Sequence, residues 1–225
     1  TSTNNAGENK PVAAEVGLGS RVAAITSTFT QGNLTHVENP FSVALEGDGF
    51  FQIRTESGEL QYTRDGSFEI SPVANGNMLC TSDGNPVLDA YGNQIILPSN
   101  RVATDLVVNQ DGTLAFPDGT GNPAVITDAN GRPVKFGIYQ FNNPAGLSKE
   151  GSNNYSVTVA SGAAVAENGN AAVKQTKTHQ YYTEASNVDV ANEMVNLIVA
   201  QRAYEMNSKA IQASDEMMQQ ANALR

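Results

Sequence analysis

Short hydrophobic runs alternate with turn sequences through most of the chain, and this pattern changes near the C-terminus. From about residue 16 to residue 185 the runs are rich in β-branched and aromatic residues. They are separated by turn sequences such as Gly47-Asp48-Gly49, Asp65-Gly66 and Gln110-Asp111-Gly112. Turns at such short intervals are typical of antiparallel sheets. The pattern therefore predicts a mainly β domain over residues 16–185, folded as an antiparallel β-sandwich or a partly open barrel.

Two local features refine this prediction. Asp65-Gly66 is a strong hairpin signal, because both residues tolerate positive φ angles, and it predicts that residues 59–64 and 67–70 form adjacent strands. The run 21–29 is predicted as a first β segment. Residues 1–15 are polar and turn-prone, and we expect them to form a mobile lead-in.

From Ser186 the hydrophobic period changes from that of a strand to that of a helix. Ser186 and Asn187 are candidate N-cap residues, and Asp189 and Glu193 place negative charge near the start, where the helix dipole favours it. No Pro or Gly follows Ser186. The sequence therefore predicts one long helix over residues 186–225.

The apolar residues of this predicted helix form a narrow stripe. One row recurs at every seventh position and comprises Val190, Leu197, Tyr204, Ile211 and Met218. A companion row becomes more polar along the chain and comprises Met194, Gln201, Ser208 and Asp215. A narrow stripe of this kind is typical of a coiled-coil seam. We expect the helix to pack in a coiled-coil-like inner core, against another molecule or against a segment that this chain lacks. Packing against its own β domain is the alternative.

Composition excludes several classes of partner. The chain has 225 residues, with 23 acidic and 13 basic side chains, a net charge of −10 and a pI near 4.6. Nucleic-acid binding requires clustered Lys and Arg, and docking on an anionic membrane requires the same. No apolar run is long enough to span a bilayer, and the N-terminus lacks the basic and apolar regions of a signal peptide. It also lacks an initiator Met, so we expect the chain to be a fragment or a processed product.

The sequence offers little for catalysis or metal binding. Cys80 is the single cysteine, and its apolar surroundings favour a buried core residue over a nucleophile. His36 and His179 are isolated, which argues against a histidine-based metal site. Asp48 and Asp65 could form a carboxylate pair, but both belong to turn motifs, and the Gly47-Asp48-Gly49 turn lacks the Lys of a phosphate-binding loop. We therefore predict a protein that is not an enzyme, with no catalytic, cofactor-binding or metal-binding residues.

Two long motifs resemble the flagellar rod and hook proteins. The first is Glu46-Gly47-Asp48-Gly49-Phe50-Phe51, followed by Tyr62-Thr63-Arg64-Asp65-Gly66-Ser67-Phe68. The second is the C-terminal run from Glu184 to Ile211, including Arg202-Ala203-Tyr204-Glu205. Two shorter runs, 30–34 and 143–147, are also similar to segments of the family. Within the family, the C-terminal run is most similar to the distal rod members.

The resemblance implies a structural role in the flagellar basal body, between periplasm and outer membrane. It implies a helical homopolymer that transmits torque from motor to hook, exported through the flagellar type III apparatus. The implied partners are further copies, other rod subunits, the hook protein and the surrounding ring proteins, with no direct insertion into the membrane. The helix stripe would form the inner seam, and Phe50, Phe51, Tyr62 and Phe68 would shape the core or contact face of the β domain.

Two departures leave alternatives open. The apolar N-terminal helix of the family, which pairs with the C-terminal helix, is absent from this sequence. The region 117–135 is longer and richer in turns than a minimal distal rod protein requires. A proximal rod or hook-like member of the family is therefore one alternative. A secreted β-domain hydrolase or carbohydrate-binding module with a helical tail is another.

Overall fold

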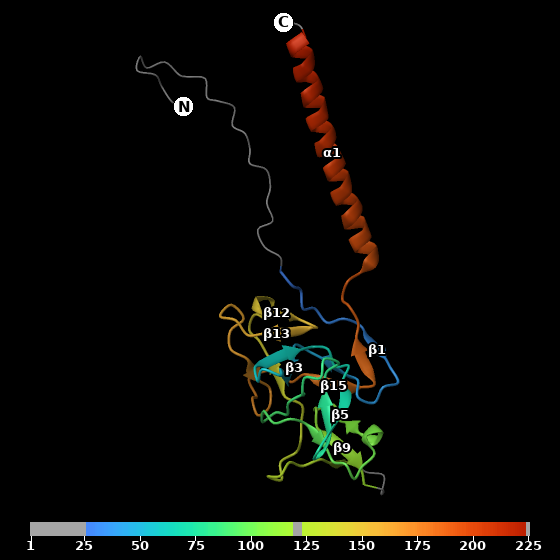
Figure 1. The fold of residues 1–225 in the computed structure, drawn as a ribbon, viewed down its shortest axis with the longest axis vertical. Coiled ribbons are helices and arrows are strands. Elements are labelled where there is room, and N and C mark those ends of the chain that lie inside the picture. Colours follow the sequence, from blue (N-terminus) through green and yellow to red (C-terminus); the bar gives the residue numbers. More distant parts are fainter. Residues whose placement is uncertain (1–25, 119–122, 224–225) are drawn as a thin grey trace, which may run out of the picture.

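The computed structural model describes residues 26–118 and 123–223, with the side chains of residues 221 and 222 left out. Its strands form antiparallel sheets beneath one long helix (Figure 1). The largest sheet has six strands in the order β12-β13-β4-β3-β11-β14. Its members are β3 (Phe50–Arg54), β4 (Leu60–Thr63), β11 (Ile138–Gln140), β12 (Ser148–Gly151), β13 (Asn154–Ser156) and β14 (Val165–Ala166).

Smaller sheets complete the β domain. Two sheets have three strands each, in the orders β5-β6-β7 and β10-β9-β8. Two further sheets have two strands each and pair β1 with β16 and β2 with β15. Their strands are β1 (Leu34–His36), β2 (Val43–Glu46), β5 (Glu69–Val73), β6 (Gly76–Cys80), β7 (Ile96–Leu97), β8 (Val107–Val108), β9 (Leu114–Pro117), β10 (Pro123–Val125), β15 (Lys177–Gln180) and β16 (Tyr182–Glu184). Short 3-10 helices cover Ala103–Asp105 and Pro144–Gly146. The predicted mainly β, antiparallel fold with a long C-terminal helix is confirmed, and among the described residues no sheet closes on itself.

Strand β3 is an interior strand of the large sheet, between β4 and β11, and both of its faces are buried. Phe51 and Ile53 point into the main core, where Phe51 packs against Phe68 and Phe136 with ring centroids 5.0 and 5.3 Å apart. Phe50 points to the other face, into a second cluster with Tyr62, Phe141 and Leu147. Alternation of side chains along one strand therefore supplies two cores.

The hairpin prediction at Asp65-Gly66 is wrong. β4 pairs with β3 and β13, whereas β5 pairs with β6, so the two strands flanking this turn do not pair with each other. Gly66 is required for close approach rather than for positive φ, because a Cβ at this position would overlap the carbonyl oxygen of Val43. Its carbonyl accepts a hydrogen bond of 3.0 Å from the Val43 amide, which ties the turn to β2.

The N-terminal and C-terminal parts of the β domain are joined by long-range pairing. β15 pairs with β2, and β16 pairs with β1 in the register Leu34↔Glu184. Between the two strands Tyr181 has a positive φ of 64°, an unusual conformation for a residue with a side chain. At this residue the chain stops pairing with β2 and begins to pair with β1. The chain then leaves the domain toward the helix beside β1 (Figure 1).

Helix α1 (Val190–Ala223) projects away from the β domain (Figure 1). It begins four residues after Ser186, and the predicted N-caps Ser186 and Asn187 are wrong. Asp189 caps the helix, because its carboxylate accepts a bond of 2.9 Å from the Ala191 amide. The Asn187 amide group instead binds Thr28 and Thr30, which removes it from the helix start. Of the run 21–29, residues 26–29 form no strand, while residues 21–25 and the lead-in 1–15 lie outside the described part.

Candidate functional site

The two β-domain motifs meet because β3 and β4 are paired. Their register places Phe51 opposite Thr63 and Gln52 opposite Tyr62, so the turn before β3 and the turn after β4 lie at the same end of the hairpin. Gly47 has a φ of 138° and begins the turn, while Asp48 is exposed within it. A Cβ on Gly49 would meet the side chains of Ile138 and Thr176. The motif glycines therefore serve a tight turn packed against its surroundings.

Arg64 links both motifs to the base of the helix. Its Nη1 donates hydrogen bonds to the carbonyl oxygens of Gly47 and Gly49, at 2.9 and 3.1 Å. Its Nε donates to Oε2 of Glu184 at 3.0 Å, and Nη2 lies 2.9 Å from the same oxygen. Each of these two side chains is only 15% exposed. A guanidinium suits this position because its planar fork serves several acceptors at once.

Glu184 extends the link to the N-terminal segment. Its Oε1 accepts a hydrogen bond of 2.9 Å from the Gly32 amide, and the Ala185 amide donates to the Asn33 carbonyl at 2.8 Å. A Cβ on Gly32 would overlap the Ala185 carbonyl oxygen, so the two segments approach as closely as glycine allows. We call this junction, formed by residues 28–34, Arg64 and residues 184–189, the neck.

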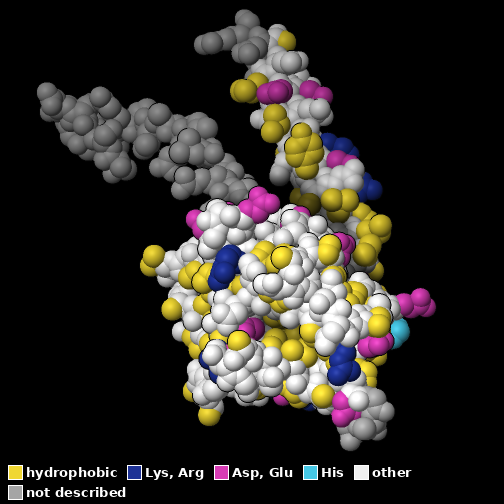
Figure 2. Space-filling model, turned by 60° about the horizontal axis from the view of Figure 1, so that its bottom comes forward, with side chains coloured by type: hydrophobic (Ala, Val, Ile, Leu, Met, Phe, Trp, Pro, Cys, Tyr) yellow, Lys and Arg dark blue, Asp and Glu magenta, His cyan; other side chains and the backbone are white. Residues whose placement is uncertain are grey.

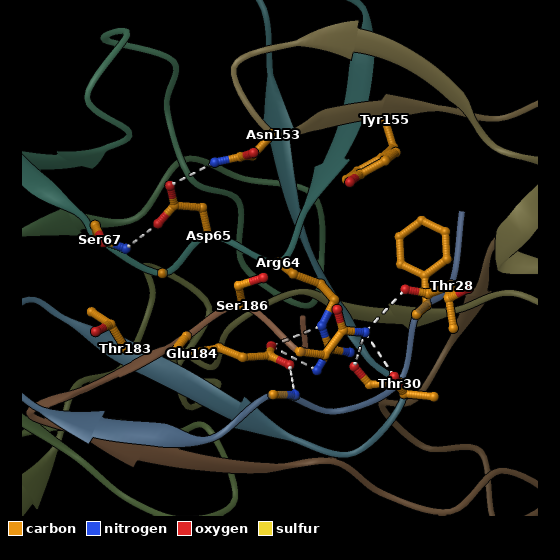
Figure 3. A pocket seen from close by; sticks show the side chains of 15 residues that line it. Thr28, Thr30, Arg64, Asp65, Ser67, Asn153, Tyr155, Thr183, Glu184 and Ser186 are labelled. Atoms are coloured by element: carbon orange, nitrogen blue, oxygen red, sulfur yellow. Dashed lines mark hydrogen bonds and ion pairs between the residues drawn. The ribbon is translucent and has the colours of Figure 1, made fainter. Parts of the chain in front are cut away.

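The neck borders an open pocket of about 450 Å³. Figure 3 shows Arg64 paired with Glu184 among the lining residues, near Ser186 and Thr30, and Asp65 beside Asn153 in another part of the lining. Two further lining residues are bonded to each other, because the Asn187 Nδ2 donates to Thr30 Oγ1 at 2.7 Å. Asp65 accepts bonds from the Ser67 amide and from Asn153, at 3.0 and 3.2 Å. These polar groups form hydrogen bonds with one another, and the bonds join distant segments of the chain around the pocket.

Aromatic rings of the β domain pack against the neck through Phe29. Phe29 packs edge-to-face on Phe50 and on Tyr155, with centroids 5.6 and 5.4 Å apart. Arg64 lies 5.7 Å from the Phe50 ring centroid. Phe29 and Tyr155, together with Glu184 and Asn187, were not singled out as site residues in the sequence. They come from distant parts of the chain. The pairing of β13 with β4 brings Tyr155 close to Arg64, and the pairing of β16 with β1 places Glu184 beside the segment that holds Phe29.

The predicted seam residues share an exposed face of α1. They are Val190 (64% exposed), Met194 (62%), Leu197 (69%), Tyr204 (76%), Ile211 (64%) and Met218 (61%), with Gln201 also exposed. From Val190 to Gln220 every side chain is exposed except those of Glu205 and Ser208, which are half-buried. Hydrophobic side chains are accordingly visible along the protruding helix in Figure 2. The structure therefore brings the β-domain motif together but leaves the seam without a partner among the described residues.

The remaining candidate residues have structural contacts. Cys80 is 4% exposed in the core, and burial raises the pKa of its thiol. The His179 Nε2 lies 2.7 Å from Oε2 of Glu46, and this hydrogen bond is the main cause that lowers the pKa of the Glu46 carboxyl. His36 packs edge-to-face on Tyr182 at 5.4 Å. In the described ranges, no three His, Cys, Asp or Glu side chains are grouped as a metal site.

The fold defines a class of protein in which a β domain carries a long terminal helix whose apolar side chains face solvent. Two family models match the chain. Residues 44–116 match the flagellar hook protein FlgE/F/G D1 domain, and residues 179–224 match the flagellar basal body rod FlgEFG protein C-terminal region. The β-domain motif and the helix therefore each lie within a matched region.

Curated relatives point the same way. The chain is 38% identical over 220 residues to the flagellar basal-body rod protein FlgG of Borreliella burgdorferi. The alignment covers 96% of this chain and 76% of the relative. It is 38% identical over 211 residues to FlgG of Agrobacterium fabrum, covering 92% and 73%. It is 34% identical over 199 residues to the flagellar hook-basal body complex protein FlhP of Bacillus subtilis, covering 87% and 69%.

The chain belongs to the flagellar basal-body rod and hook protein family. Within it the chain is a FlgG-like rod protein, a structural subunit of the distal rod of the flagellar basal body, as the sequence motifs predicted. Over the residues that the structure describes, no helix is both long and apolar enough to cross a membrane. Membership of this family associates the chain with other components of the basal body.

Proposed function

We propose that this subunit assembles through its C-terminal helix into a helical homopolymer that transmits torque from motor to hook. The observation that carries the proposal is the exposed seam on α1, defined by Val190, Leu197, Tyr204, Ile211 and Met218. Leaving large apolar side chains in water is costly, about 25 cal/mol per Å² of apolar surface. A helix of 34 residues, about 50 Å long, that exposes such a seam gains stability only when a partner covers it.

In this proposal the helix forms the inner layer of the rod and the β domain of residues 16–185 forms the outer layer. Met194 and Gln201 belong to the same exposed seam and complete the inner contact. Repetition of one head-to-tail contact gives an open helical array when its rotation does not close into a ring. The neck holds the two layers together, because Arg64 binds both the β-domain turn and Glu184 at the base of the helix.

The proposed role is structural and not catalytic. Arg64, Asp65 and Glu184 all use their charged groups to join segments of the chain. The proposed partners are further copies, other rod subunits, the hook protein and the ring proteins around the rod. Neither nucleic acid nor a cofactor has a part in it.

The test replaces Leu197 and Ile211 with Asp in the full-length protein, in cells that lack the native copy. We expect basal bodies that end at a short rod without a hook when viewed by electron microscopy. The purified variant should keep the thermal unfolding midpoint of its β domain, because both residues lie on the protruding helix. The double substitution takes the net charge from −10 to −12.

A matched control is Lys209→Asp combined with Glu216→Asp, which also takes the net charge from −10 to −12 on the same helix. Both positions lie away from the seam, so these cells should build complete rods and hooks. Complete hooks in the Leu197→Asp, Ile211→Asp strain would overturn the seam assignment. Short rods in both strains would mean that the added negative charge, and not loss of the seam, causes the defect.

A further inference from the structure

Three Asn-Gly pairs occur in the chain, at Asn75-Gly76, Asn130-Gly131 and Asn168-Gly169, and the structure describes all of them. An asparagine before a glycine is chemically labile, because the amide nitrogen of the glycine can attack the side-chain carbonyl carbon. Glycine has no side chain to block this approach. All three asparagines are exposed. Since the pairs share this local chemistry, differences in the surrounding fold should decide which of them reacts.

The Asn168-Gly169 pair occupies the centre of a turn that follows β14. The Asn170 amide donates to the Glu167 carbonyl at 3.2 Å, which closes the turn without using the Gly169 amide. Among the residues that the structure describes, the Gly169 amide has no hydrogen-bond acceptor. A Cβ on Gly169 would meet nothing within 4 Å, so the space around it is open. The attacking nitrogen is therefore unrestrained, and ring closure meets no neighbouring atoms there.

The Asn130-Gly131 pair is a close structural match with one difference. Gly131 has a φ of 74°, against 75° for Gly169, and a Cβ on it would also meet nothing within 4 Å. The Gly131 amide, however, donates to the Asp128 carbonyl at 3.0 Å, and the Asn130 amide donates to the Asp128 carboxylate at 2.8 Å. The attack requires the Gly131 nitrogen to give up its proton and turn toward the side chain. Its hydrogen bond opposes both changes.

The Asn75-Gly76 pair is restrained by packing. Gly76 begins β6, is buried, and pairs with Val73 across the β5–β6 hairpin. A Cβ on Gly76 would overlap the carbonyl oxygen of Leu97. Any rearrangement of the main chain at this position therefore requires the strands to separate. The fold thus restrains two of the three pairs and leaves Asn168-Gly169 open.

We infer that Asn168 is a site of spontaneous deamidation in the folded subunit. The Gly169 nitrogen forms a bond to Cγ of Asn168, the Cγ–Nδ2 bond breaks, and the proton from Gly169 leaves with the amide nitrogen as ammonia. Water then opens the resulting succinimide ring at either of its two carbonyl carbons, which gives aspartate or isoaspartate. Each conversion replaces a neutral amide with a carboxylate and takes the net charge from −10 to −11. This inference does not depend on the proposed function.

The new carboxylate lies next to a buried carboxylate in the sequence. Glu167 is 5% exposed, and it accepts hydrogen bonds from the Thr176 hydroxyl at 2.6 Å and the Thr176 amide at 2.7 Å. Thr176 in turn lies against Gly47 and Gly49 of the β-domain motif. Isoaspartate lengthens the main chain by one carbon atom, so the turn that follows Glu167 cannot keep its shape. We expect the modification to loosen this support of the motif.

The test incubates the purified full-length subunit in mildly alkaline buffer and follows the three pairs by peptide mass spectrometry. Asn168 should convert at least about fivefold faster than Asn130, a ratio that corresponds to about 1 kcal/mol, the usual net contribution of one hydrogen bond. Asn75 should convert no faster than Asn130. A more acidic form should accumulate on ion exchange, and the Asn168→Ser variant should lack it. That variant should keep its thermal unfolding midpoint, because the Asn168 side chain is exposed.

Urea distinguishes the effect of the fold from that of the local sequence. In the unfolded chain the Asp128 carbonyl and the Leu97 carbonyl no longer restrain the other two pairs, so the three rates should converge. A ratio that persists in urea would mean that neighbouring residues in the sequence select Asn168, and it would overturn the inference. Equal conversion of Asn168 and Asn130 in the folded subunit would overturn it too, as would an acidic form that persists in Asn168→Ser.

Discussion

At the scale of single residues, Arg64 donates hydrogen bonds to three acceptors and connects the neck to the β domain. Its guanidinium donates to two carbonyls of the turn before β3 and to the Glu184 carboxylate, so it ties that turn to the neck. Removing one partner of a largely buried pair leaves the other group desolvated and unpaired, which costs more than the pair itself contributes. The neck is therefore more sensitive to loss of Arg64 than its exposure alone suggests.

We expect Arg64→Met to lower the free energy of unfolding by about 2–3 kcal/mol, because Glu184 and two carbonyls lose their donor. Arg101→Met is the matched control, since Arg101 is exposed and donates one bond of 2.9 Å to the Pro117 carbonyl. Its substitution should cost about 0.5 kcal/mol or less. Urea unfolding followed by circular dichroism measures both values. Equal losses in the two variants would show that Arg64 has no special role.

The same residue shows why the sequence could predict the motif but not the site. The turns around Gly47 and Asp65 are local features, visible in a few consecutive residues. The partner of Arg64, however, lies 120 positions away in Glu184. The Asp65-Gly66 prediction failed for a related reason, because Gly66 is needed to approach Val43 in another strand. Local preference cannot distinguish that need from a requirement for positive φ.

At the scale of elements, α1 and the β domain differ in what stabilises them. The strands of the large sheet are held by side chains buried on both faces of β3, including Phe50, Phe51 and Ile53. Helix α1 has its own backbone hydrogen bonds and the Asp189 cap, but its side chains face solvent. The sequence predicted the helix well, because its period is local, and misplaced its start because Asn187 is recruited by Thr30.

We expect amide hydrogen exchange in the isolated subunit to be fast along α1 and slow in β3 and β4. Local opening of a helix without tertiary packing costs about 0–2 kcal/mol, whereas the core strands exchange only on global unfolding. Exchange followed by mass spectrometry resolves the two regions. The same helix peptides should become protected in assembled rods. Protection of residues 190–220 equal to that of β3 in a monomer would contradict this view.

At the scale of the whole molecule, the apolar helix and the acidic surface act against each other. A net charge of −10 repels other copies at long range. In the proposed assembly the seam attracts them at short range, because contact between copies buries its apolar side chains. No residue in the seven-spaced row of the seam is charged. Association is thus limited by repulsion between the acidic surfaces of the subunits outside the seam.

This balance predicts that salt strengthens self-association. Raising ionic strength from about 0.01 M to about 0.15 M shortens the screening length from about 30 Å to about 8 Å, which removes repulsion between acidic surfaces. It leaves burial of apolar side chains largely unchanged. Sedimentation velocity of the full-length subunit should therefore show larger species at the higher salt concentration, and Leu197→Asp with Ile211→Asp should remove that increase. If salt dissociated the copies instead, ion pairs would hold them together, and the seam would not be the main contact.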